Sequence, residues 1–241
     1  MIRDSFVRSN YGMKNGFRWR GTETTRLEGF SDAVFAFAIT LLVVSLEVPN
    51  NFTELQRLMQ GFIAFGISFT LLVMIWHSHY TFFRQYALHD TKIMVLNSIL
   101  LFVVLFYIYP LKFLFTFLIG QILGFEAKPV SDIIQANQVV TLMIIYSAGY
   151  FAVFFVFLLM HLHAYKQRIL LELNNLEIVH NINSIRVNII HMSVSVLSIL
   201  ISIIGGAGYT AFAGFIYILL GPAMAINGGY FGRKLKRLSK N

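Results

Sequence analysis

The sequence predicts an all-α integral membrane protein with about six transmembrane helices and both chain ends on the cytoplasmic side. Composition, long apolar segments and the placement of lysine and arginine all indicate this class. Of the 241 residues, 57% are hydrophobic and only 12% are charged, whereas soluble domains carry about 25% charged residues. So much apolar surface needs a bilayer as its solvent. The absence of cysteine excludes disulfides, thiolate nucleophiles and cysteine-based zinc sites.

Six apolar segments are long enough to cross a bilayer, which takes about 20 residues of helix. We expect the spans at about residues 30–48, 58–80, 93–120, 139–162, 187–204 and 209–231. The third span contains Pro110 and Lys112, and the sixth contains Pro222. The glycine-rich stretch between the last two spans, at residues 205–208, is typical of a tight outer turn.

The cations indicate the orientation of these spans. If the N-terminus is cytoplasmic, all of the 19 lysines and arginines except Arg57, Lys112 and Lys128 fall on the cytoplasmic side. This bias follows the rule that cytoplasmic loops are enriched in lysine and arginine, and it agrees with an even number of spans. The net charge of +8 therefore reflects membrane topology. It predicts the lipid bilayer, and no nucleic acid, as a partner.

The chain divides into one membrane domain and two short tails. Residues 1–25 are predicted to form a basic cytoplasmic tail, 26–232 the six-helix domain, and 233–241 a second basic cytoplasmic tail. We expect the first tail to be mobile rather than a folded cap, because its apolar residues show little periodicity. No signal peptide is evident in the first 29 residues. The stretch 165–186 is predicted to be an amphipathic cytoplasmic connector.

The start of the first span concentrates polar residues at a membrane boundary. It reads Arg26-x-x-x-Phe30-Ser31-Asp32 and then becomes apolar. Ser31 and Asp32 are residue types that cap helix N-termini, which is the purely structural interpretation. The functional interpretation is a buried polar network, because an ionisable group inside a membrane usually serves a function.

Polar residues of the next two spans lie at the same predicted depth as Asp32. Trp76, His77 and His79 end the second span, and Asn97 begins the third, so all four are candidate partners for the first span. Metal binding is the weaker interpretation of the histidines, because positions i and i+2 do not share a helix face. The other pair, His161 and His163, is expected at the lipid headgroup boundary.

These residues resemble a known family. Arg26-x-x-x-Phe30-Ser31-Asp32 is similar to the signature of the transmembrane protein 175 family, the lysosomal and endosomal potassium channels and their prokaryotic relatives. Trp76-x-x-His79 and Asn97 resemble elements of the family's second and third helices. The resemblance implies the prokaryotic form, a homotetramer of six-helix subunits whose first helices line a central pore. It further implies a plasma-membrane location, potassium as the permeant ion and no cofactor.

The resemblance also implies where the pore narrows. Carried over by position, Phe37 forms the innermost hydrophobic ring, Leu41 a middle position, Val44 the outer ring, and Thr40 a ring of hydroxyls between them. The family usually has isoleucine or leucine where this chain has Phe37. An apolar constriction makes an ion give up part of its water, which favours potassium over sodium. Without the resemblance, the same stripe would be interpreted as ordinary helix packing.

The favoured hypothesis is therefore a potassium-selective cation channel that conducts passively and catalyses no reaction. The alternative is a proton-coupled secondary transporter that uses Asp32 and a histidine, although no internal repeat of the kind common in transporters is evident. An intramembrane enzyme ranks last, because the sequence contains no zinc-protease or serine-hydrolase motif.

Overall fold

Long helices account for nearly all of the chain that the structure describes. The structure, a computed structural model, describes residues 13–14, 17–21, 23–44, 49–123 and 135–238. A two-stranded antiparallel hairpin comes first, with Met13 opposite Arg18. The N-terminal half consists of β1 (Met13–Lys14), β2 (Phe17–Arg18), α2 (Arg26–Val44), α3 (Phe52–Gln60), α4 (Phe62–Tyr86) and α5 (Thr91–Leu123).

The C-terminal half contains two helices of 31 residues and a third that is interrupted. Its elements are α7 (Ala136–Lys166), α8 (Asn175–Gly205), η1 (Gly206–Tyr209), α9 (Thr210–Phe215), η2 (Ile216–Leu219) and α10 (Leu220–Leu238). Gly206 has a φ of 60°, which glycine adopts at little cost. This glycine ends α8 and opens the turn that was expected there.

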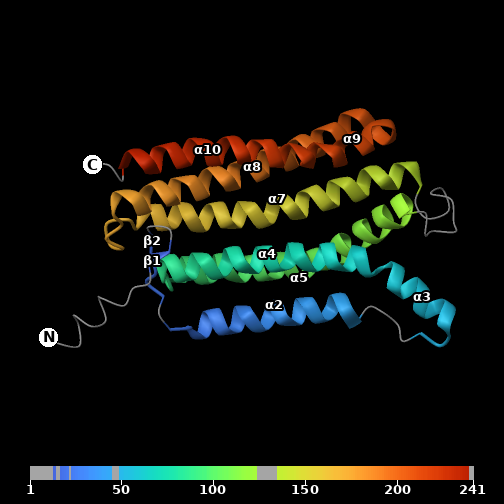
Figure 1. Cartoon of the computed structure of the whole chain (residues 1–241), viewed down its shortest axis with the longest axis horizontal. Coiled ribbons are helices and arrows are strands. Elements are labelled where there is room, and N and C mark those ends of the chain that lie inside the picture. The colour runs from blue at the N-terminus through green and yellow to red at the C-terminus, as the bar shows by residue number, and fades with distance from the viewer. Residues whose placement is uncertain (1–12, 15–16, 22, 45–48, 124–134, 239–241) are drawn as a thin grey trace.

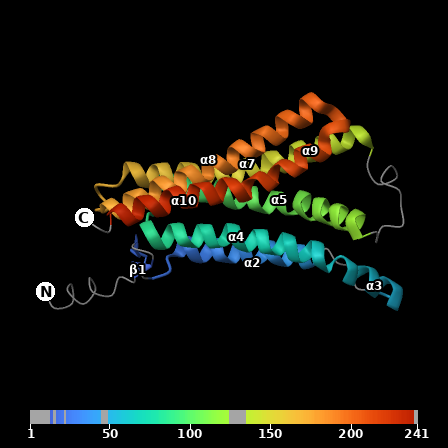
Figure 2. The ribbon, with the colours of Figure 1, turned by 45° about the horizontal axis from the view of Figure 1, so that its top comes forward.

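The long helices lie side by side, roughly along one axis (Figure 1). In both views α2 lies next to α4 and α5, while α7, α8 and α10 form the other side of the bundle (Figure 2). The hairpin and the end of α10 lie at the same end of the bundle, and α3 and α9 lie at the opposite end (Figure 1). This arrangement requires an even number of crossings between the hairpin and the end of α10.

Five described helical segments are long and apolar enough to cross a membrane. They are Phe62–Tyr86, Thr91–Phe115, Gln138–Lys166, Asn175–Tyr209 and Phe212–Leu235. Helix α2, with 19 residues, is the further candidate. The prediction of a helical, multi-pass membrane protein is therefore confirmed, with five to six membrane-capable helices.

The start of the fifth span differs from the prediction for a local reason. The fifth span was expected to begin at 187, but α8 begins twelve residues earlier, at Asn175. Asn174 and Glu177 form a reciprocal capping box there. Such a box satisfies two of the orphan N–H groups at a helix start, so it moves the start into a polar stretch that hydropathy does not detect.

Two apolar clusters form the core. The larger joins α2, α4, α5 and α7 through buried side chains such as Phe35, Phe83 and Leu100. The smaller surrounds Tyr107 and also includes residues of α7 and α9. Gly149 on α7 lies directly against the Tyr107 ring, leaving no room for a β-carbon. The core thus holds one face of α2 against the rest of the subunit.

Candidate functional site

Helix α2 has one buried face and one exposed face. Ser31, Phe35, Ala38 and Leu42 are buried, and their spacing of three or four residues places them on one side of the helix. The opposite side is exposed and consists of Arg26, Gly29, Phe30, Ala33, Ala36, Phe37 and Thr40. Phe37 is 57% exposed within the single chain. The exposed face therefore forms a continuous, largely apolar strip along α2.

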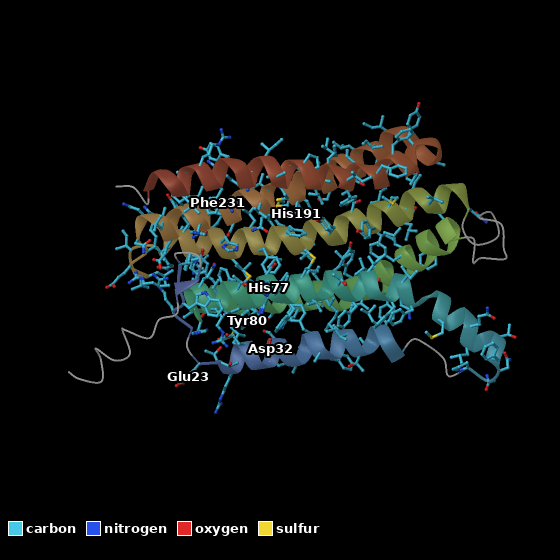
Figure 3. All side chains as sticks on the ribbon, in the orientation of Figure 1. Glu23, Asp32, His77, Tyr80, His191 and Phe231 are labelled. Atoms are coloured by element: carbon cyan, nitrogen blue, oxygen red, sulfur yellow. The ribbon has the colours of Figure 1, made fainter. Side chains whose placement is uncertain are left out.

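A tryptophan of α4 holds the start of α2. The indole Nε1–H of Trp76 donates a 2.8 Å hydrogen bond to Oδ1 of Asp32. The Trp76 ring also stacks on Tyr80, with 5.8 Å between centroids. Figure 3 shows Asp32 on α2 near Tyr80 of α4, whereas His77 lies farther from α2, toward α7. His77 itself is exposed and stacks loosely on Tyr80, so the structure does not bring it into contact with α2.

A second, fully buried chain of hydrogen bonds ties three helices together. The Asn97 side chain donates through Nδ2 to Ser31 Oγ at 2.8 Å, and its Oδ1 lies 2.8 Å from His79 Nε2. Ser31 in turn donates to the carbonyl of Leu27, at 2.8 Å. The exposed fractions of Ser31, His79 and Asn97 are 1% or less. These bonds satisfy polar groups where water is excluded, and thereby fix the rotation of α2.

The first turn of α2 is stabilised by a carboxylate that the sequence reasoning did not single out. Glu28 accepts hydrogen bonds from the N–H and hydroxyl of Thr25, and Thr25 accepts one from the Glu28 N–H. Arg84 of α4 lies 3.7 Å from the other Glu28 oxygen. The Thr-x-x-Glu spacing of a capping box was the signal that could have revealed this role. Arg26, the motif's cation, is exposed.

The predicted constriction residues do not share one environment. Phe37 and Thr40 are exposed, whereas Leu41 is partly buried at the edge of the strip. Val44 is the last residue of α2, and its side chain lies outside the described residues. Ala33 lies near the centre of the exposed face, although the sequence reasoning did not select it. At the far end of α2, the Leu42 carbonyl accepts a 3.3 Å hydrogen bond from Nζ of Lys112 on α5.

Part of the predicted tail is folded against the bundle, so the expectation of a mobile tail is wrong for residues 17–21. Phe17 is 1% exposed. Arg18 Nε and Arg20 Nη2 lie 3.2 and 2.8 Å from the carboxylate of Glu177, which is itself fully buried. Gly21 exchanges further hydrogen bonds with Arg84. These contacts join the segment before α2 to the start of α8 and the end of α4.

The expectation for His161 and His163 is also wrong, because both side chains are enclosed by protein. His161 packs against Phe82, with 5.2 Å between ring centroids. His163 Nε2 lies 2.6 Å from Oδ2 of Asp90, in the turn between α4 and α5. Both histidines are 8% exposed. Aromatic and carboxylate partners stabilise them inside the bundle. Their position near the end of a span had indicated contact with lipid headgroups instead.

Comparison with known proteins identifies the relatives of this chain. The family model of the endosomal/lysosomal potassium channel TMEM175 matches residues 26–107. A protein of Marivirga tractuosa named "Potassium channel" is 43% identical over 94% of this chain and 95% of its own length. A potassium channel of Chamaesiphon minutus is 36% identical over 41% of this chain and 52% of its own length.

Two solved structures that match this chain are also potassium channels. The crystal structure of a variant of the potassium channel MtTMEM175, bound to a nanobody–MBP fusion, matches with a TM-score of 0.82 and 42% identity. The match covers 92% of this chain and 99% of that one. A lysosomal potassium-selective channel TMEM175 homologue from Chamaesiphon minutus gives a TM-score of 0.50 at 25% identity, over 83% of this chain and 98% of that one. This chain belongs to the TMEM175 potassium channel family.

Proposed function

We propose that four copies of this chain form a potassium-selective cation channel, with the exposed face of α2 lining a central pore. The observation that carries the proposal is the contrast between the two faces of α2. Hydrogen bonds from Trp76 and Asn97 fix one face, while the strip from Phe30 to Thr40 is exposed in the part of the subunit that the structure describes. The relatives' names as potassium channels support the choice of ion.

Thr40 has a geometry suited to a cation. Its hydroxyl donates to the Ala36 carbonyl at 2.9 Å, one helical turn back. The donor hydrogen is thereby directed into the helix, and the oxygen lone pairs remain available on the exposed side. Four such oxygens around an axis replace part of the water that a cation loses in a narrow pore. Potassium, which holds its water less tightly than sodium, needs less replacement.

The apolar rings on either side of Thr40 supply the barrier. Phe37, one turn nearer the basic end, forms the inner ring, and Val44 forms the outer ring by its spacing from Thr40. Leu41 lies at the edge of the strip, where it packs against the neighbouring copy of α2 instead of facing the ion. Small Ala33 leaves a wider segment on the inner side. Ions therefore meet a short constriction rather than a long apolar tube.

The same proposal places the basic end of the bundle in the cytoplasm. Arg18 lies in β2, Lys92 in the first turn of α5, and Lys166 at the end of α7. These element ends and the end of α10 all lie at the basic end of the bundle (Figure 1). The rule that cytoplasmic loops are rich in lysine and arginine supports this orientation, and the bacterial potassium channel that the chain resembles supports a plasma-membrane location.

Flux measurements on purified protein in liposomes test this function. We expect valinomycin-independent potassium flux that exceeds sodium flux, and a loss of that preference in Thr40→Ala. Thr70→Ala is a matched control, because Thr70 is also exposed and also donates to a carbonyl four residues back, on α4. A verified tetramer with no more flux than empty liposomes would refute the channel. Equal effects of the two threonine substitutions would refute the proposal that α2 lines the pore.

The aromatic ring has its own test. We expect Phe37→Ser to raise the ion flux, because it removes four apolar side chains from the constriction. Phe102→Ser is the control, since Phe102 is 70% exposed but belongs to α5 rather than to α2. Unchanged flux in Phe37→Ser, with the protein still assembled, would show that Phe37 does not line the pore.

A further inference from the structure

A groove runs between the start of α5 and the end of α7, at the basic end of the bundle. Its volume is about 480 Å³. Its lining is mostly apolar and includes two exposed lysines, which define its rim. The residues used below are Lys92, Val95, Leu96, Leu159, Leu162 and Lys166. None of them belongs to the exposed face of α2 or to the hydrogen bonds that anchor that helix.

The lysines at the rim are not neutralised by the subunit. In the described chain, neither Lys92 nor Lys166 takes part in an ion pair. The neighbouring acid, Asp90, is already engaged. Its Oδ1 accepts the N–H of Ile93 at the start of α5, and its Oδ2 lies 2.6 Å from His163 Nε2. The rim therefore keeps a positive charge that needs an anion from outside the subunit.

The apolar part of the groove lies in segments that cross the membrane. Val95 belongs to the span Thr91–Phe115, and Leu162 belongs to Gln138–Lys166. These two side chains are 52% and 37% exposed. An apolar groove that ends at two lysines without ion-pair partners in the described chain matches a molecule with a hydrocarbon chain and an anionic head. Basic pockets between membrane helices bind lipids of this kind.

We propose that this groove binds an anionic phospholipid of the membrane leaflet at the basic end. The phosphate lies between Lys92 and Lys166, and one acyl chain runs along Val95, Leu159 and Leu162. The lipid bridges α5 and α7 at the end where Asp90 and His163 already join them. A zwitterionic lipid fits the groove equally well but carries no net charge for the lysines. A free phosphate satisfies the lysines but leaves the groove empty.

Lipid titrations of the purified oligomer, followed by native mass spectrometry, test the proposal. Phosphatidylglycerol, phosphatidylcholine and glycerol phosphate are compared at equal concentrations. We expect saturable binding of one phosphatidylglycerol per subunit at this site, weaker binding of phosphatidylcholine and none of glycerol phosphate. Each lysine near a membrane surface contributes enough attraction to change affinity about fivefold. The double variant Lys92→Gln/Lys166→Gln should therefore bind phosphatidylglycerol about 25-fold more weakly.

Two further variants separate this site from general surface charge. Arg233→Gln/Lys234→Gln removes two cations from α10 at the same end of the bundle and should leave binding unchanged. Val95→Trp fills the groove with both lysines intact and should also abolish tight binding. Equal loss in the α10 variant would overturn the proposal, as would strong binding of glycerol phosphate. A lysine double variant that changes the subunit count, with no lipid preference in the wild type, would instead make the groove a subunit contact.

Discussion

Replacing Asn97 with leucine should destabilise the protein, although it keeps the number and branching of the side-chain heavy atoms. Asn97 is fully buried and bridges Ser31 of α2 to His79 of α4. The Nδ1 atom of His79 is buried and has no hydrogen-bond partner among the described residues. Asn97→Leu therefore leaves the whole imidazole unsatisfied, whereas the Ser31 hydroxyl keeps the Leu27 carbonyl.

The expected cost follows from the number of polar groups affected. Hydrogen bonds between membrane helices contribute about 0.6 kcal/mol each on average, and two are lost. An unsatisfied buried polar group costs about 1–3 kcal/mol. Together these give a destabilisation of about 2–4 kcal/mol. For a chain of 241 residues, this corresponds to a fall in Tm of about 4–16 °C.

Thermal unfolding in one detergent, at one protein concentration, measures the change. Ser98→Ala is the matched control, because Ser98 is exposed and bonds only to the Met94 carbonyl of its own helix. The double variant His79→Phe/Asn97→Leu removes both polar partners and should recover most of the lost stability. An Asn97→Leu protein as stable as wild type would refute the reasoning. So would a double variant that is less stable than the single one.

Two other predictions concern contacts outside this network. Glu177→Gln should destabilise the protein by about 2–3 kcal/mol. This is less than the cost of breaking a fully buried ion pair, because one of the two arginine partners of Glu177 is partly exposed. Faster proteolysis before residue 26 should accompany the lower Tm, and an unchanged cleavage rate would contradict this role of Glu177. Gly149→Ala should cost about 1–3 kcal/mol, because its new methyl group meets the Tyr107 ring. Gly66→Ala, on α4 with open space around it, should instead raise the Tm through helix propensity, and identical Tm shifts in the two alanine variants would contradict the packing argument.

The contacts at the start of α2 were predictable in kind because three helices carry polar residues at one membrane depth. Buried polar side chains in a bilayer need hydrogen-bond partners, and few polar residues other than those of these three helices were available to Asp32 and Asn97. The structure brings together Asp32 with Trp76, and Ser31 with Asn97 and His79. Which of the two histidines of α4 would join depended on helix rotation, and that rotation is determined by packing.

The exposed face of α2 was predicted only approximately. Carrying the family's constriction over by position selected Leu41 and omitted Ala33. The exposed strip is centred elsewhere because Phe35 and Leu42 pack into the core and thereby set the rotation. The sequence of a single helix with apolar residues on all sides gives little indication of which face will be buried. Only the positions of its neighbours decide it.

The folded hairpin was missed because its partner is remote in sequence. Glu177 lies 159 residues after Arg18, within a stretch interpreted as a polar connector. No local periodicity connects two arginines to that carboxylate. The Asn174–Glu177 capping box was visible in the sequence, but it indicated a helix start and gave no sign of the arginines.

Metal-ion block of a single introduced thiol tests the pore assignment most directly. The chain has no cysteine, so Thr40→Cys introduces one thiol per subunit. If four α2 strips surround the conduction path, micromolar Cd²⁺ should block potassium flux through Thr40→Cys and should not affect Thr70→Cys or the wild type. Unblocked flux through Thr40→Cys, with the thiol shown to be reduced, would contradict the account, because the strip would then face lipid or protein instead of the permeating ion.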